Sequence, residues 1–230
     1  IILFYTLNMN PIEIIPAINA ATFAEVQEKI RIAEPHAEGP DNGGIKWVHI
    51  DVADGSFTDI SLWHNPKDLL MLQTPLFVEV HLMLMNIDER IQEWLEPIVR
   101  RIIFHREASR NPDTVIEACR ASDIQVGIAI QPDSPVDLVL PYLEKVDLVQ
   151  TLAVAPGPSG QKLRPETVPK IIALRHACPA CPIEVDGGVT NETASTVVRA
   201  GASLLVAGAA LFSAGDFTYA LEELKRHAAI

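Results

Sequence analysis

The strongest constraint on the fold of this chain is the regular alternation of strand-like and helix-like segments along nearly its whole length. Runs rich in β-branched and aliphatic residues predict strands at 12–18, 46–52, 76–83, 101–105, 125–130, 146–154, 183–186 and 203–207. Amphipathic patterns between them predict helices at 21–33, 66–72, 88–95, 112–120, 136–143, 165–177, 192–200 and 217–227. Eight strand–helix pairs predict an α/β fold, a single (β/α)8 TIM barrel. A doubly wound open sheet is the alternative, weakened because no Gly-x-Gly-x-x-Gly follows the first strand.

No change in composition divides the chain, so we expect one domain over residues 10–230. Residues 1–9 are treated as an N-terminal tail of uncertain status. Their apolar run lacks the basic leader and small-residue cleavage site of a signal peptide, and Met9 is a more natural start.

The charge balance argues against two classes of partner. With 18 basic and 30 acidic residues, the formal net charge is -12. A general nucleic-acid binder and a protein that docks on anionic membranes both need a basic surface, so neither is expected. No segment of the sequence is apolar over the length that a bilayer requires. A phosphorylated substrate remains compatible, since backbone amides at helix N-termini hold phosphate without positive side chains.

The three cysteines are too few, and odd in number, for a disulfide framework, so we expect a reducing, cytoplasmic environment. Cys178 and Cys181 form a single Cys-x-x-Cys, whereas a zinc ribbon needs a second such pair. We interpret this one as a chance pair in a proline-containing loop, with a redox role as the alternative.

Polar side chains gather at the predicted C-terminal ends of four strands, where barrels of this class place their active sites. Because side chains alternate along a strand, the polar residues share the inward face and the aliphatic residues face the helices. The set consists of His49 and Asp51 on 46–52, Glu79 and His81 on 76–83, His105 and Glu107 at the end of 101–105, and Glu184 and Asp186 on 183–186.

Two imidazoles and two carboxylates at one end of a barrel suit one divalent metal ion, with Zn²⁺ preferred and Fe²⁺, Mn²⁺ or Co²⁺ as alternatives. Such an ion polarises a substrate carbonyl and stabilises an enediolate. Carboxylates on separate strands can act on opposite faces of one carbon, one removing a proton and the other supplying it. Epimerisation without a nicotinamide requires this division. A buried His–Asp pair that only hydrogen-bonds is the alternative interpretation.

Glycine-bearing turns follow the last three predicted strands, at 156–160, 186–188 and 207–209. Glycine lets backbone amides approach an anion closely, and the helix N-termini that follow add positive potential. The last loops of such barrels often form a phosphate site. One such turn alone predicts only a tight connection, whereas three in succession predict a phosphate site.

Six segments, in order along the chain, resemble the ribulose-phosphate 3-epimerase family. They are 47–55 (with His-x-Asp), 80–83 (Val-His-Leu-Met), 104–108, 155–161, 183–189 (with Val-Asp-Gly-Gly-Val) and 206–212, and the resemblance runs from residue 12 to residue 225. It implies a barrel of the ribulose-phosphate-binding type. It implies that His49, Asp51, His81 and Asp186 bind a divalent metal ion, with Asp51 and Asp186 as the catalytic acid/base pair. The implied substrate- and phosphate-binding residues are His81, Gly157, Pro158, Ser159, Gly160, Gly187, Gly188, Gly208 and Ala209.

The resemblance also implies an activity: an isomerase of carbohydrate metabolism, in the pentose phosphate pathway, that converts D-ribulose 5-phosphate to D-xylulose 5-phosphate. Its partner would be a small phosphorylated sugar, and we expect a cytoplasmic homo-oligomer. The alternatives are an epimerase of a hexulose 6-phosphate of the allulose 6-phosphate type, and a non-catalytic sugar-phosphate-binding barrel. Decarboxylases and aldolases with an Asp-x-Lys-x-x-Asp motif are disfavoured, because the third strand carries Glu79 and His81 without a lysine.

The chain departs from the family's usual pattern outside the implied metal ligands. Ala20 stands where the family usually has a serine near the reacting hydroxyls, Ala53 replaces a methionine and Ser56 replaces a histidine. In the phosphate turns Pro158 removes one amide donor, and Ala209 replaces a serine. These departures bear on the substrate and the turnover more than on the type of reaction.

Overall fold

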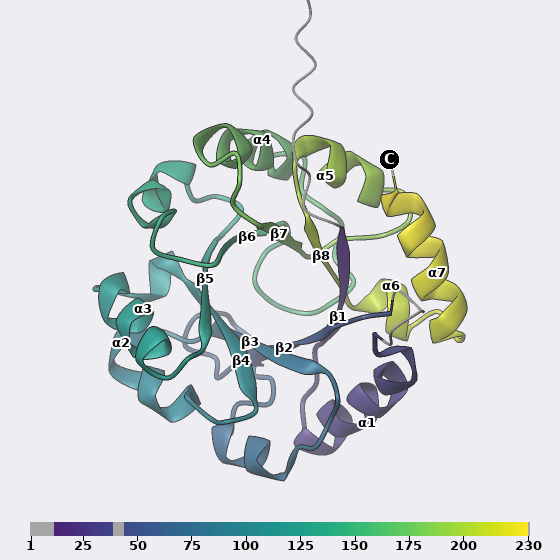
Figure 1. The fold of residues 1–230 in the computed structure, drawn as a ribbon, viewed down its shortest axis with the longest axis horizontal. Coiled ribbons are helices and arrows are strands. Elements are labelled where there is room, and N and C mark those ends of the chain that lie inside the picture. The colour runs from purple at the N-terminus through teal and green to yellow at the C-terminus, as the bar shows by residue number, and fades with distance from the viewer. Residues whose placement is uncertain (1–11, 39–43, 230) are drawn as a thin grey trace, which may run out of the picture.

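Eight parallel strands close into a barrel that helices surround (Figure 1). The strands pair in chain order, and the last pairs with the first. Their bounds are β1 Glu13–Ile18, β2 Trp47–Ala53, β3 Phe77–Met83, β4 Val99–His105, β5 Gln125–Ile130, β6 Leu148–Leu152, β7 Ile183–Asp186 and β8 Leu204–Ala207. The predicted TIM barrel is therefore confirmed.

The structure is a computed structural model, and it describes residues 12–38 and 44–229. The predicted tail at 1–9 lies outside the described residues.

Helices and short 3₁₀ turns connect the strands on the outside of the barrel (Figure 1). The α-helices are α1 Phe23–Ala33, α2 Ile87–Arg90, α3 Pro112–Ala121, α4 Thr167–Ala177, α5 Ala194–Ala200, α6 Ala209–Phe212 and α7 Phe217–Ala228. The 3₁₀ turns are η1 Glu34–His36, η2 Pro66–Met71, η3 Ile91–Trp94, η4 Arg106–Ala108, η5 Val136–Leu138 and η6 Leu140–Tyr142. Thr22 begins α1 by accepting a hydrogen bond from the Glu25 amide, and Asp216 begins α7 in the same way from Tyr219.

Three predicted helices differ in kind from the prediction. The segment 136–143 folds as η5 and η6, because Pro141 lies inside it and has no amide hydrogen to continue an α-helix. The segment 66–72 is the 3₁₀ turn η2, and 88–95 is divided between α2 and η3. Conversely, α6 was not predicted, because its four residues are too few to show a helical period.

The two faces of the barrel sheet carry different side chains. Val48, Ile50 and Phe104 belong to the main hydrophobic core, in which the outward faces of the strands pack under the helices. The inward face has a smaller apolar cluster around Trp47 and Ile103, together with a layer of buried polar side chains. The predicted alternation, polar inward and aliphatic outward, is therefore confirmed.

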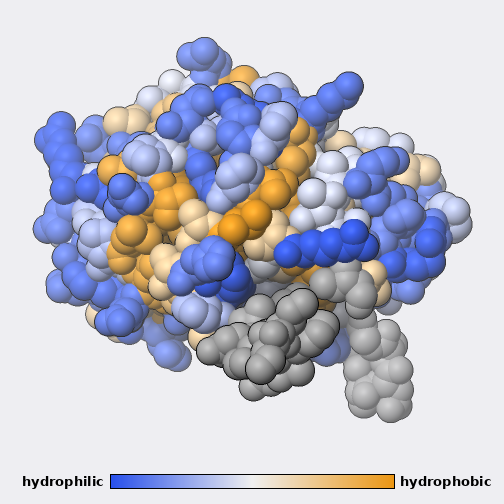
Figure 2. All heavy atoms as spheres, turned by 90° about the horizontal axis from the view of Figure 1, so that it is seen from above, coloured by the Kyte–Doolittle hydropathy of each residue, from blue (hydrophilic) through white to orange (hydrophobic). Residues whose placement is uncertain are grey.

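The outer surface is mainly hydrophilic on the face that Figure 2 shows, with apolar patches between the polar side chains. The large apolar side chains that the described residues expose are Ile32, Leu70, Met71, Phe77, Leu140, Ile172 and Tyr219. Among the described helices, none has the length and apolar character needed to cross a bilayer.

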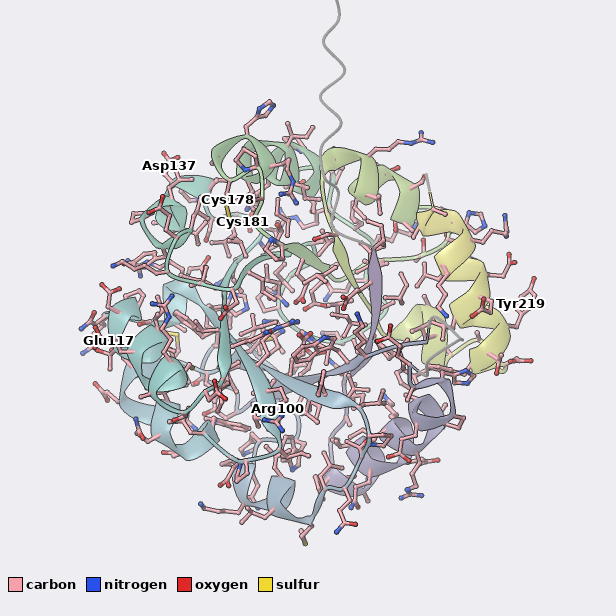
Figure 3. The ribbon with its side chains drawn as sticks, in the orientation of Figure 1. Arg100, Glu117, Asp137, Cys178, Cys181 and Tyr219 are labelled. Carbon is pink, nitrogen blue, oxygen red and sulfur yellow. A yellow bond between two sulfur atoms is a disulfide. The ribbon has the colours of Figure 1, made fainter. Side chains whose placement is uncertain are left out.

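Cys178 and Cys181 form a disulfide just beyond the end of α4, at the outer edge of the barrel (Figure 3). The turn through Pro179 and Ala180 brings their Cα atoms to 5.4 Å, which lies within the range of bridged pairs. The interpretation of this motif as a chance pair is therefore wrong. A single disulfide still does not make the disulfide framework that the sequence argued against.

Candidate active site

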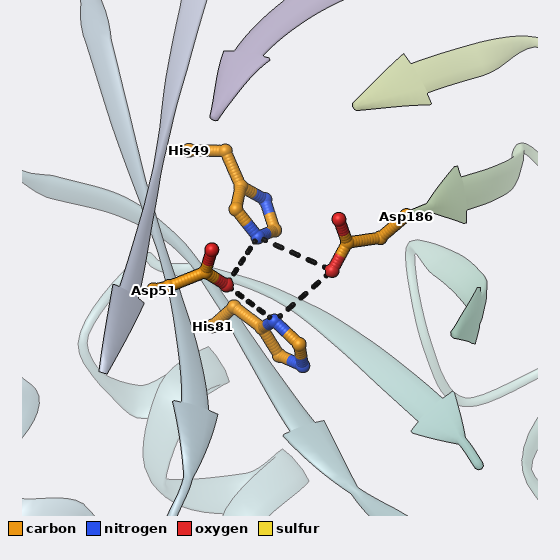
Figure 4. Close-up of side chains that lie close together, drawn as sticks. All are labelled: His49, Asp51, His81 and Asp186. Carbon is orange, nitrogen blue, oxygen red and sulfur yellow. Dashed lines mark hydrogen bonds and ion pairs between the residues drawn. The ribbon is translucent and has the colours of Figure 1, made fainter. Parts of the chain in front are cut away.

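Four side chains from three strands meet inside the barrel (Figure 4). His49 and Asp51 come from β2, His81 from β3 and Asp186 from β7. Nε2 of His49 lies 3.4 Å from Asp51 Oδ1 and 3.8 Å from Asp186 Oδ2. Nδ1 of His81 lies 3.0 Å and 3.3 Å from the same two oxygens. The structure thus brings together the four residues for which the sequence suggested a shared metal ion.

The spacing of these donor atoms fits a divalent cation. Zinc bonded tetrahedrally at about 2.0–2.1 Å separates neighbouring ligand atoms by about 3.3 Å, close to the four measured distances of 3.0–3.8 Å. All four residues are buried, and Nε2 of His49 has no hydrogen-bond partner among the described residues. A buried polar atom without a partner is costly unless something binds it, so this cluster could hold a metal ion.

The carboxylates give the cluster a negative potential that favours positive charge. Burial alone would lower the pKa of His49 and His81, but hydrogen bonds to the carboxylates and their charges outweigh burial and raise both pKa values. Burial would raise the pKa of Asp51, yet its contacts with the two imidazoles lower it. Because the carboxylates raise both pKa values, protons compete with a cation for this cluster, and metal binding would be linked to proton release.

A third histidine extends the cluster toward β4. Nε2 of His105 lies 2.9 Å from Nε2 of His81, and its ring packs on Phe57 with centroids 4.4 Å apart. Burial lowers the pKa of His105 to about 4, so the ring is neutral at pH 7. Burial would raise the pKa of Glu107, but its contacts with His105 and its other hydrogen bonds outweigh burial and lower the pKa to about 2. The neutral ring of His105 can accept a hydrogen bond from Nε2 of His81. Nδ1 of His81 then faces the carboxylates.

A pocket joins the cluster to the glycine turns. Asp51 and Asp186 line it, whereas His49 and His81 are fully buried and are not among its lining residues. Every other residue suggested for substrate or phosphate binding also lines it: Gly157, Pro158, Ser159, Gly160, Gly187, Gly188, Gly208 and Ala209. The pocket therefore has carboxylates in one part and backbone turns in another, as a phosphorylated substrate needs.

Two side chains hold the turn after β6. Oγ1 of Thr58 donates to the carbonyl of Pro156 at 2.8 Å. Nε2 of Gln161 donates to the carbonyls of Ala155 and Pro158, at 2.8 Å and 3.0 Å. These bonds set the shape of the turn.

Sequence reasoning missed other polar residues near the site. Asn19 lines the pocket, and its amide donates to Oδ2 of Asp51 at 3.4 Å. Arg101 lies inside the barrel and donates to Glu79 at 2.6 Å. The alternation that turns His105 inward also turns Arg101 inward, so the sequence could have predicted the inward position of Arg101. No sequence pattern marked Asn19.

Three departures from the family's pattern do not reach the pocket. Ala20 packs in the outer core, Ala53 is buried in a small apolar cluster, and Ser56 ties the loops after β2 and β3 together through hydrogen bonds. Pro158 and Ala209 do line the pocket. Any effect of the departures on substrate choice is therefore expected mainly from Pro158 and Ala209.

Comparison with known proteins decides the family. The sequence profile described as the ribulose-phosphate 3 epimerase family matches residues 13–212. The chain belongs to this family. It is therefore an isomerase of the epimerase class, as the sequence predicted.

Curated relatives are named ribulose-phosphate 3-epimerase. The chain is 32% identical over 220 residues to the ribulose-phosphate 3-epimerase of Mycobacterium bovis, covering 94% of this chain and 92% of the relative. It is 33% identical over 187 residues to that of Eremothecium gossypii, covering 76% and 78%.

Solved structures of other enzymes share the barrel. The 3-hexulose-6-phosphate synthase from Salmonella typhimurium aligns with a TM-score of 0.71 at 13% identity, covering 94% of this chain and 98% of that one. Orotidine 5'-monophosphate decarboxylase from Sulfolobus solfataricus aligns with a TM-score of 0.61 at 12% identity, covering 95% and 98%. At these identities the likeness extends to the fold alone.

Proposed function

We propose that this chain inverts C3 of D-ribulose 5-phosphate to give D-xylulose 5-phosphate, a step of the pentose phosphate pathway. The observation that carries the proposal is the position of Asp51 on β2 and Asp186 on β7, both lining one pocket with the glycine turns. Relatives that cover most of the chain bear the name ribulose-phosphate 3-epimerase, which supports this substrate.

In the proposed reaction Asp51 and Asp186 exchange protons with one carbon from opposite faces. One carboxylate takes the C3 proton, which leaves an enediolate, and the other, already protonated, delivers a proton to the opposite face. The roles are reversed in the return direction. One proton leaves and one arrives, so the reaction needs no oxidant or reductant.

His49, Asp51, His81 and Asp186 would hold one divalent cation. We propose Zn²⁺, because two imidazoles and two carboxylates form a borderline ligand set, with Fe²⁺, Mn²⁺ and Co²⁺ as competitors. When bound, the ion would stabilise the negative charge that develops on the substrate oxygens. Metal content of the purified protein, measured by elemental analysis, tests the choice of ion.

The phosphate of the substrate would bind to backbone amides of the turns after β6, β7 and β8. No lysine or arginine is among the described residues that line the pocket, so no side-chain cation is available there. The first amides of α6 have no partner within that helix and add to the donors of Gly187 and Gly188. Pro158 contributes no donor, since it lacks an amide hydrogen.

Deuterium exchange in two variants tests the acid/base pair. We expect Asp51→Asn and Asp186→Asn each to lower epimerisation by at least ~10²-fold. Each variant keeps one carboxylate, which reaches C3 from one face only. Each should therefore still exchange the C3 hydrogen of one epimer with D₂O, and the two variants should act on different epimers. Asp54→Asn is the matched control, since Asp54 follows β2 but does not line the pocket. Wild-type turnover in either active-site variant, or exchange of both epimers by one variant, would contradict the pair.

The substrate is tested by measuring kcat/KM for ribulose 5-phosphate and for allulose 6-phosphate, with and without a chelator. A higher value for the hexulose would replace the proposed substrate but keep the chemistry. Absence of turnover on both, with metal bound, would favour the non-catalytic sugar-phosphate-binding alternative.

We also propose a cytoplasmic homo-oligomer, because closed symmetric assemblies are common among soluble enzymes. In a reducing cytoplasm Cys178 and Cys181 would exist as thiols. Thiol alkylation after acid quenching of cells tests the compartment, and size-exclusion chromatography with light scattering tests the assembly.

A further inference from the structure

A layer of buried polar side chains lies inside the barrel, next to the four-residue cluster. Strand pairing places its members side by side: His49 on β2 is opposite Glu79 on β3, and Glu79 is opposite Arg101 on β4. His49 and Glu79 are fully buried and Arg101 is 7% exposed. Charged side chains in such a place are costly unless each has a partner, so their contacts need an explanation.

Glu79 links the other two members. Its Oε1 lies 2.6 Å from Nδ1 of His49, and its Oε2 accepts a hydrogen bond of 2.6 Å from Nη1 of Arg101. Arg101 is held in turn, because its guanidinium lies 3.8 Å from the ring centroid of Trp47 and its Nε donates to Gln125 at 3.0 Å. The carboxylate of Glu79 therefore has a fixed position against the imidazole.

This arrangement determines which nitrogen of His49 carries the hydrogen. An ionised carboxylate can only accept, so Nδ1 of His49 must donate to it. The lone pair of the neutral ring is then on Nε2, the atom that faces Asp51 and Asp186 and has no hydrogen-bond partner among the described residues. Glu79 thus prepares His49 to bind a cation through Nε2.

We propose that Glu79, held by Arg101, is a positioning residue that keeps His49 in the tautomer and orientation needed to bind the metal ion. The inference rests on the proposed metal site. Carboxylates that accept the second N–H of a metal-bound histidine affect metal affinity by about 10- to 100-fold in other metalloproteins.

Glu184 offers a matched comparison within the same layer. It is fully buried like Glu79, but its Oε1 lies 4.0 Å from Nδ1 of His49, too far for a hydrogen bond. It accepts a hydrogen bond of 3.0 Å from Gln150 instead. A change from a carboxyl group to an amide at position 184 therefore alters the polar layer without altering the hydrogen-bond partner of His49.

The test compares the zinc affinity of Glu79→Gln and Glu184→Gln with that of the wild type, by competition with a chromophoric chelator. An amide can either accept or donate, so glutamine at position 79 tolerates both tautomers of His49. We expect Glu79→Gln to weaken zinc binding by about 10- to 100-fold and Glu184→Gln to change it by less than about threefold. Wild-type affinity in Glu79→Gln, or an equal loss in both variants, would overturn the inference.

A second variant guards against a folding defect, since Glu79→Gln removes the carboxylate 2.6 Å from Nη1 of Arg101 and leaves only Glu184, at 4.0 Å. The double variant Glu79→Gln/Arg101→Met removes the ion pair as a unit, which proteins often tolerate. We expect it to melt cooperatively and to show the same loss of zinc affinity. Wild-type affinity in a folded double variant would overturn the inference.

Nuclear magnetic resonance gives a direct readout that a purely structural role would not move. In the zinc-loaded wild type, ¹H–¹⁵N correlation spectra should show a protonated Nδ1 and a metal-bound Nε2 for His49. A metal-bound Nδ1 at His49 would refute the inference while leaving the metal site intact. A wild-type protein that binds no divalent metal would refute the metal site itself, and the inference with it.

Discussion

Gly188 occupies a place with no room for a side chain, and its replacement tests whether the turns at the pocket hold the phosphate. Its φ is +68°, in the left-handed region. A Cβ added there would lie 2.2 Å from the backbone nitrogen of Leu163 and 2.6 Å from its Cα. Backbone atoms cannot rotate away, so the chain that follows the β6 turn would have to move by about 1 Å to reach ordinary contact distance.

The structure sets the size of the effect of Gly188→Ala. The left-handed conformation costs alanine about 1–2 kcal/mol, which lowers Tm by about 2–8 °C in a domain of this size. The clash adds a displacement of Leu163, which lies two residues beyond the last pocket-lining residue of the β6 turn, Gln161, and a misplacement of about 1 Å can lower catalytic efficiency by about 10²-fold. We expect most of this loss as a higher KM, since under the proposed function the turns would bind the phosphate while Asp51 and Asp186 act on C3.

Steady-state kinetics, together with the inhibition constant of inorganic phosphate, measure the effect. Gly215→Ala is the matched control: its φ is +77°, but no heavy atom lies within 4 Å of the added Cβ, and it does not line the pocket. It should lose only the stability that the left-handed conformation costs and keep kcat/KM within about twofold. The reasoning is refuted if Gly188→Ala keeps wild-type kcat/KM, or if Gly215→Ala loses as much.

The remaining predictions concern the support of the site and the stability of the barrel. Thr58→Val removes the hydroxyl that donates to Pro156, so KM should rise by about 3- to 10-fold with kcat little changed; an unchanged KM in the steady-state assay would contradict this role. The pKa of Glu107 is lowered to about 2, so its charge stabilises the fold above about pH 4.3 and this stability is lost as the pH falls toward that pKa. Urea midpoints of the wild type should therefore fall more steeply over this window than those of Glu107→Gln, and parallel curves would refute the assignment. Reduction of the Cys178–Cys181 bridge opens a short loop worth about 2 kcal/mol of chain entropy, so Tm measured by calorimetry should drop by about 4–8 °C. Activity at 25 °C should not change, because neither cysteine lines the pocket; a parallel loss of activity would contradict this.

Much of the fold could be predicted because strand and helix patterns are local. Alternation along β2 puts His49 and Asp51 on the face opposite Val48 and Ile50, and this holds for any strand covered by helices on one side. The pattern failed where a single residue overrides it, as Pro141 does between η5 and η6. It also failed for α6, which is too short to show a period.

The candidate site could be predicted as a set of residue types at strand ends, but not as a set of distances. Parity placed His81 and Asp186 inward, yet whether they lie within 4 Å of each other depends on how β3 and β7 face each other across the closed barrel. The bond from Thr58 to Pro156 spans 98 residues and left no pattern in the sequence.

The sequence by itself determined the order of strands and helices, the inward parity of the polar residues and the positions of the glycine turns, because each depends on neighbours a few residues apart. Barrel closure decided the rest: the convergence of His49, Asp51, His81 and Asp186, and the bonding of Glu79 to both His49 and Arg101. Those contacts join different strands, and only the register between strands fixes the distance between their side chains.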